Sequence, residues 1–150
     1  MNAFRTVHRY WASLLTLAVI VQIGFAGYGA FSAADKVSDG SIDENAFEDG
    51  FGLHIALGYF IFLGSLVLLL VSLGTRNRSR ILWSLLVAGL LVVQILLAWT
   101  GASLPAVFGF LHPVNALIIL AVLGSLTGRM WREDRAATMA ATPATSPPTA

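Results

Sequence analysis

The sequence predicts an all-α fold of the polytopic membrane class, a four-transmembrane-helix bundle. Only 11% of its 150 residues are charged, whereas 57% are hydrophobic, and a soluble domain averages about a quarter charged residues. The charges are also absent from three long tracts, residues 10–34, 50–75 and 81–128. No stretch shows the alternation of a β-barrel strand. These observations exclude a soluble globular enzyme, a disordered chain and a protein that binds nucleic acid.

The length of each charge-free tract indicates how many helices it holds. A hydrocarbon core of about 30 Å needs about 20 apolar residues at 1.5 Å each. The tracts of 25 and 26 residues therefore hold one span apiece, and the tract of 48 residues holds two, separated by the glycine, serine and proline of 101–105. A cleaved signal peptide is an alternative for the first span, but its apolar part exceeds the usual stretch of roughly 7–15 residues. The predicted spans are 10–31, 51–74, 80–101 and 106–128, within a domain of residues 1–135.

The arginines predict an orientation. All eight lie before the first span, between the second and third, or after the fourth, whereas the connection of residues 32–50 contains Lys36 and six acidic residues. Because basic residues in short loops favour the cytoplasmic side, we expect a multi-pass protein of the cell membrane with both termini in the cytoplasm and 32–50 as an acidic outer loop. Ser41 and Glu44 have capping-box spacing, so we expect this loop to turn helical before Gly50.

The last fifteen residues differ in composition from the rest. Residues 136–150 are alanine, threonine, proline and serine with one methionine. Such a segment cannot bury a core, so we expect a disordered cytoplasmic tail. The chain has no cysteine, which excludes disulfides, thiolate metal sites and covalent attachment of a c-type haem.

The first and third spans suggest an internal repeat. An offset of 72 positions matches Trp11 with Trp83 and Gln22 with Gln94, among eight identities in residues 11–30. The second and fourth spans align in turn on the strings Leu53-His54 and Leu111-His112. We therefore expect a parallel duplication of a helical hairpin.

Few strongly polar side chains lie within the predicted spans, and each is a candidate functional residue because such groups are costly in hydrocarbon. His54 and His112 should lie at similar depths near the outer face, on parallel helices, which suits axial ligation of haem iron. Gly58, one turn below His54, would make room for the porphyrin. Copper or zinc is an alternative, although no carboxylate or thiolate lies in the spans to complete the site. Each histidine could instead bond to a neighbouring helix.

The remaining polar residues have less specific expectations. Gln22 and Gln94 lie level with each other and should bond between helices, or alternatively contact a cofactor edge or a quinone. Asn115, one turn below His112, could orient the His112 ring. For His8, beside Arg9 in the cytoplasmic flank, we expect no particular role.

Three short strings carry a resemblance to known families. Leu53-His54-Ile-Ala-Leu-Gly58-Tyr59, Val93-Gln94-Ile-Leu-Leu-Ala98 and Leu111-His112 resemble one four-helix half of haem A synthase. Over about residues 8–130 the chain resembles more closely an uncharacterised family of small four-helix membrane proteins, a domain of unknown function, with a string like His112-Pro113-Val114-Asn115.

The first resemblance implies that His54 and His112 bind haem. It does not extend to catalysis. The catalytic half of haem A synthase uses carboxylates on its first helix, and residues 10–34 contain none. The arginine that often follows the family's histidines is replaced here by Ile55 and Pro113, and haem hydroxylation is therefore not expected.

The leading expectation is a membrane protein that binds one b-type haem between its second and fourth helices, for electron transfer or haem handling. The alternative is a cofactor-free accessory or scaffold subunit of a larger membrane complex. No catalytic constellation indicates an enzyme, and a transporter would need more polar residues along its pathway. The expected partners are the lipid bilayer and a membrane-complex or redox partner.

Overall fold

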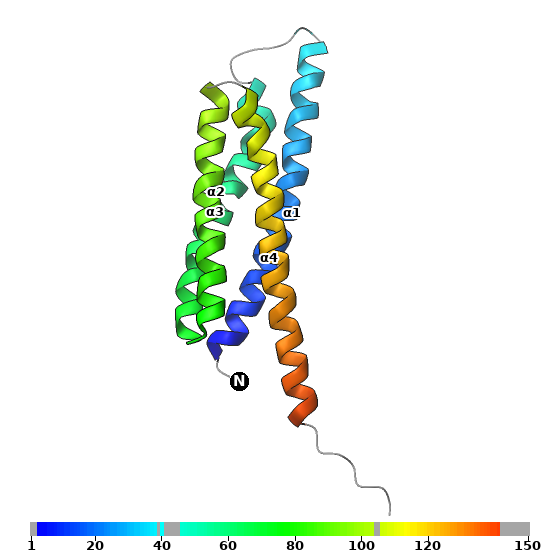
Figure 1. Cartoon of the computed structure of the whole chain (residues 1–150). Helices are drawn as coiled ribbons and strands as arrows, with labels where there is room; N and C mark the ends of the chain where they lie inside the picture. Colours follow the sequence, from blue (N-terminus) through cyan, green and yellow to red (C-terminus); the bar gives the residue numbers. More distant parts are fainter. Residues whose placement is uncertain (1–2, 39, 41–45, 104–105, 142–150) are drawn as a thin grey trace, which may run out of the picture.

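The computed structural model describes residues 3–38, 40, 46–103 and 106–141, and these ranges form four helices (Figure 1). The all-α fold is therefore confirmed. Each helix is long and apolar enough to cross a membrane, which indicates a multi-pass membrane protein. In chain order the helices are α1 (Ala3–Ser38), α2 (Ala46–Gly74), α3 (Arg78–Ser103) and α4 (Ala106–Ala141).

The four helices form a closed ring. Each packs against its neighbours in sequence, and α4 completes the ring by packing against α1. The diagonal pairs, α1 with α3 and α2 with α4, do not pack against each other within the described ranges. Diagonal helices can therefore meet only through side chains that reach across the middle of the bundle.

Two ends of the bundle can be distinguished (Figure 1). The start of α1, the turn between α2 and α3 and the last turns of α4 lie together, and we call this the basic end (residues 3–9, 74–80 and 129–141). The opposite end, where α1 ends and α2 begins, carries Asp35 and Asp49, and we call it the acidic end. The described ends of the chain thus lie at the same end of the bundle.

Apolar side chains fill the bundle and also cover its outside. Leu15, Ile61, Leu68 and Leu123 are fully or almost fully buried along its axis. Outward-facing leucines are well exposed, and Leu70 is 66% exposed. A contiguous apolar surface of this extent is unfavourable in water and favourable in lipid, which agrees with the ability of the helices to cross a membrane.

The helices are longer than the predicted spans. α1 extends seven residues beyond 10–31 at each end, and α2 begins at Ala46, which confirms that the chain is helical before Gly50. The Ser41–Glu44 capping box lies outside the described residues. α3 ends at Ser103 and α4 begins at Ala106, so the break falls within the predicted 101–105.

α4 corrects the prediction for the end of the chain. We expected disorder from residue 136, but the helix continues to Ala141 and extends past the other helices at the basic end (Figure 1). Alanine is the strongest helix former, and a helix already nucleated in the bundle propagates at little cost. The expectation for the remainder of this segment falls outside the described residues.

A tight turn makes α2 and α3 antiparallel. Arg76 has a φ of 51°, and the Thr75 hydroxyl donates to the Ser72 carbonyl at the end of α2, at 2.6 Å. Asn77 is the N-cap of α3, because its Oδ1 accepts from the Arg80 backbone N–H at 3.1 Å.

Candidate functional site

Each helix contributes one polar side chain to a site in the half of the bundle nearer the acidic end. Gln22 comes from α1, His54 from α2, Gln94 from α3 and His112 from α4. Although α2 and α4 are diagonal in the ring, the His54 and His112 ring centroids are 6.1 Å apart, with an interplanar angle of 60°. The structure thus brings together the two histidines that the sequence singled out.

The same contact holds each histidine in its hairpin. His54 Nδ1 is 3.1 Å from the Gln22 backbone oxygen, and His112 Nδ1 is 3.1 Å from the Gln94 backbone oxygen. A carbonyl oxygen only accepts, so Nδ1 carries the hydrogen and Nε2 is the acceptor of each neutral ring. An identical glutamine–histidine contact in both halves is what a duplicated hairpin predicts.

The α3–α4 half of the site is a closed hydrogen-bond network. Gln94 Nε2 donates to His112 Nε2 at 3.0 Å, and Gln94 Oε1 accepts from Asn115 Nδ2 at 2.7 Å. Asn115 also donates to the Leu90 carbonyl at 3.0 Å. Asn115 therefore orients His112 indirectly, by fixing the Gln94 amide.

The α1–α2 half is less complete. Gln22 Nε2 donates to the His54 backbone oxygen at 2.7 Å, but the buried Gln22 Oε1 has no donor among the described residues. Within the same ranges, His54 Nε2 takes part in no hydrogen bond, and the His54 ring packs edge-on against Phe51. Two acceptors, one from each of these helices, are thus left unsatisfied by the described protein.

Glycines bring α1 and α2 close enough for these contacts. A Cβ on Gly29 would lie 2.9 Å from the Gly50 backbone oxygen, and a Cβ on Gly58 would lie 3.0 Å from Gln22 Nε2. In this structure the Gln22 amide occupies the space beside Gly58, so a porphyrin could use that space only after the Gln22 side chain turns away.

The donor set limits which metals the site can hold. No group of three or more histidine, cysteine or carboxylate side chains gathers in the described parts of the chain. Zinc and copper sites normally need at least three protein ligands. Two imidazoles are sufficient only where another group supplies the remaining ligands.

His8, for which we expected no particular role, makes contacts with two other helices. Its side chain is fully buried, with Nε2 at 2.9 Å from Ser84 Oγ on α3 and Nδ1 at 3.0 Å from Met130 Sδ on α4. His8 therefore joins three helices at the basic end. Its spacing provides a signal, since His8 shares a helical face with the buried Ala12, Leu15 and Val19.

Charged residues surround His8. Burial and the nearby Arg80 guanidinium lower the pKa of His8 from 6.5 to about 4, so the ring is neutral at physiological pH. Arg9 forms an ion pair with Asp134, and Arg80 pairs with Glu133 at 2.7 Å. The two acidic residues of α4 thus tie its end to α1 and α3.

Comparison of the chain with models of protein families, with curated proteins and with solved structures finds no significant match. The function is therefore inferred from the polar residues and their contacts.

Proposed function

We propose that this protein spans the cell membrane and binds one b-type haem between α2 and α4, with His54 and His112 as the axial ligands, for electron transfer or haem handling. The observation that carries the proposal is the pair of imidazoles from diagonal helices, with ring centroids 6.1 Å apart. A metal bound about 2 Å from each Nε2 requires a centroid separation of about 6 Å. The spacing is therefore sufficient for an iron ion between the two rings once both Nε2 atoms face it, which requires His112 Nε2 to leave the Gln94 amide.

The hydrogen bonds of the two rings support the same assignment. Each Nδ1 donates to a helix carbonyl, the usual partner of the nitrogen that does not bind metal, and this leaves Nε2 as the ligand atom. His54 Nε2 already lacks a partner among the described residues. His112 Nε2 is released when the Gln94 amide turns away, so Gln94 controls access to the second ligand.

Haem would supply reversible transfer of a single electron. The protein's own residues would hold the iron and orient the rings. Gln22 would border the same space, and its unsatisfied Oε1 is a further reason to expect another molecule there, because a buried acceptor without a donor costs about 1–3 kcal/mol.

The distribution of charge supports an orientation for the bundle. The arginines at the basic end favour the cytoplasmic side, which puts both described chain ends in the cytoplasm. The histidine pair then lies in the outer half of the membrane, where a redox partner on the outer side of the membrane can approach it.

Absorption spectroscopy tests the proposal. Protein purified in mild detergent from haem-replete cells should show a Soret band and split α and β bands after reduction. His54→Ala and His112→Ala should each lose these bands. His8→Gln is the matched control, because His8 lies at the basic end and should leave the spectrum unchanged. A wild-type protein that is colourless and does not bind added haemin at one equivalent would overturn the proposal.

The closed Gln94–Asn115 network favours a second candidate, a cofactor-free subunit of a larger membrane complex. In that case the amide of Gln94 permanently satisfies His112, and the site serves only to pack helices. Gln94→Leu separates the two candidates. If the protein binds haem, Gln94→Leu should keep or tighten haem binding, because a competitor for His112 Nε2 is removed. If the network is purely structural, its loss in Gln94→Leu should weaken the bundle. In that case neither protein should contain pigment, and a partner should co-purify with the wild type.

A further inference from the structure

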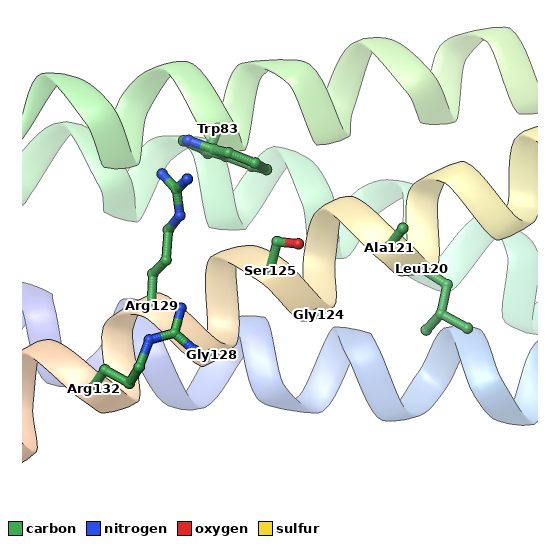
Figure 2. A pocket seen from close by; sticks show the side chains of 8 residues that line it. All are labelled: Trp83, Leu120, Ala121, Gly124, Ser125, Gly128, Arg129 and Arg132. Atoms are coloured by element: carbon green, nitrogen blue, oxygen red, sulfur yellow. The ribbon is translucent and has the colours of Figure 1, made fainter.

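A groove between α3 and α4 near the basic end is separate from the histidine pair. It has a volume of about 570 Å³. Figure 2 shows Trp83 on one side and the α4 residues on the other, with Arg129 and Arg132 at the end nearer the chain terminus. Gly124 and Gly128 reduce the side-chain bulk on this face of α4, and Ser125 between them contributes a hydroxyl to the lining.

The arginines of the groove differ from those that stabilise the bundle. Arg9 and Arg80 are paired with Asp134 and Glu133. In the described ranges, neither Arg129 nor Arg132 forms an ion pair with a carboxylate. The Arg129 guanidinium instead lies 4.7 Å from the centre of the Trp83 ring, a cation–π contact that leaves its N–H groups available to an anion.

The groove changes character along its length. Arg129 is the first charged residue after the tract of residues 81–128, so it marks the boundary between the apolar span and the cationic flank. Towards the middle of the span the groove runs past Gly124 to Leu120. A Cβ on Gly124 would meet nothing within 4 Å, so this part of the groove is open, and its lining combines Leu120 and Ala121 with the hydroxyl of Ser125.

We propose that this groove binds one anionic phospholipid of the leaflet at the basic end. Its phosphodiester would lie against the guanidinium groups of Arg129 and Arg132, the latter folded over Gly128, and an acyl chain would lie over Gly124 and Leu120. Charge complementarity selects this occupant, because two neighbouring arginines favour a phosphate, and the open continuation of the groove past Gly124 to Leu120 has room for a hydrocarbon chain. The proposal does not depend on haem binding.

Native mass spectrometry of the full chain in detergent tests the charge requirement. Phosphatidylglycerol should bind at one tight site, and phosphatidylcholine with the same acyl chains should bind at least tenfold more weakly. The double variant Arg129→Gln/Arg132→Gln should lose roughly tenfold or more in affinity for phosphatidylglycerol, since each cation near the surface contributes about 1 kcal/mol. Arg76→Gln/Arg78→Gln is the matched control, because it removes the same charge from exposed residues at the same end, outside the groove.

A second pair of variants tests the shape of the groove without changing charge. Gly124→Leu should fill the apolar part and reduce phosphatidylglycerol binding several-fold. Gly89→Leu is its control, because Gly89 is also exposed, meets nothing within 4 Å of an added Cβ and lies outside the groove. Both variants should fold, since a Cβ at either position meets nothing within 4 Å and both positions are exposed.

Four results would overturn the lipid site. Equal binding of the two lipids, or equal losses in the two arginine double variants, would indicate general attraction to charge around the protein. Full binding by Gly124→Leu would show that no acyl chain occupies the groove. Inorganic phosphate that competes as strongly as phosphatidylglycerol would identify a phosphate site instead.

Discussion

The two ends of the bundle use histidine in different ways. At the basic end His8 is fully buried, and side chains from two other helices engage both of its ring nitrogens. Nearer the acidic end, His54 and His112 are partly exposed, and each donates from Nδ1 to a helix carbonyl, while His112 Nε2 also accepts from the Gln94 amide. A histidine with both nitrogens bound to side chains joins helices, whereas one anchored through Nδ1 can present Nε2 to a ligand.

The ion pairs show the same contrast. The Arg9–Asp134 side chains are 10% and 13% exposed, whereas the Lys36–Asp49 side chains at the acidic end are 30% and 64% exposed. A buried charge that loses its partner costs more free energy than an exposed one, because water cannot solvate it. We therefore expect the basic end to hold the bundle together and the end nearer the histidine pair to adjust more easily when a ligand enters.

The largest expected effect comes from Asp134→Asn. It leaves the buried Arg9 guanidinium without its carboxylate, and breaking a buried pair costs about 3–5 kcal/mol. Unfolding in mixed detergent micelles with increasing dodecyl sulfate, followed by tryptophan fluorescence, measures the loss. Glu133→Gln is the control and should lose less, because Glu133 is 56% exposed. Equal losses in the two variants would remove the role assigned to burial.

An intermediate effect should appear as a dependence on pH. The pKa of His8 is about 4 in the folded protein and 6.5 in the unfolded chain. The unfolded state therefore binds the proton more readily, and His8 should reduce stability as the pH falls from about 6.5 towards 4. Thermal unfolding of His8→Gln over this range should show a flatter profile than the wild type. The carboxylates titrate in both proteins, so the difference between the two profiles reports the contribution of His8. Parallel profiles would contradict the low pKa of His8 in the folded protein.

The smallest effect is expected at the acidic end. Lys36→Ala removes an exposed ion pair, and such pairs contribute about 0–1 kcal/mol. The same dodecyl sulfate titration should show a small difference that decreases further at high salt. A loss of stability as large as that of Asp134→Asn would contradict the expected difference between the two ends.

Charge-free tracts predicted the number of helices but not their lengths. A tract without charge measures the part of a helix that fits hydrocarbon, and a helix can continue beyond it into water. Arg5 and Lys36 both lie within α1 although each lies outside the predicted span. The same reasoning explains residues 136–141, whose polar composition excluded a buried core but not an exposed helix.

The sequence allowed the depth of the site residues along their helices to be predicted, but not the contacts that these residues make. Position along a helix follows from the sequence at 1.5 Å per residue, so the level of the two histidines could be compared in advance. The rotation of each helix about its axis depends on packing against residues distant in sequence. For this reason the link from Asn115 to Gln94 and the contact of Gly58 with Gln22 were not foreseen.

The diagonal placement of α2 and α4 has a consequence for the histidine pair. These two helices do not pack against each other in the described ranges, so the separation of their imidazoles is set by α1 and α3, which act as spacers. Close packing at Gly29 fixes the α1 spacer. Residues that never touch the rings can thus tune the gap between them, and mutations on the spacer helices can change the strength of ligand binding while both histidines remain in place.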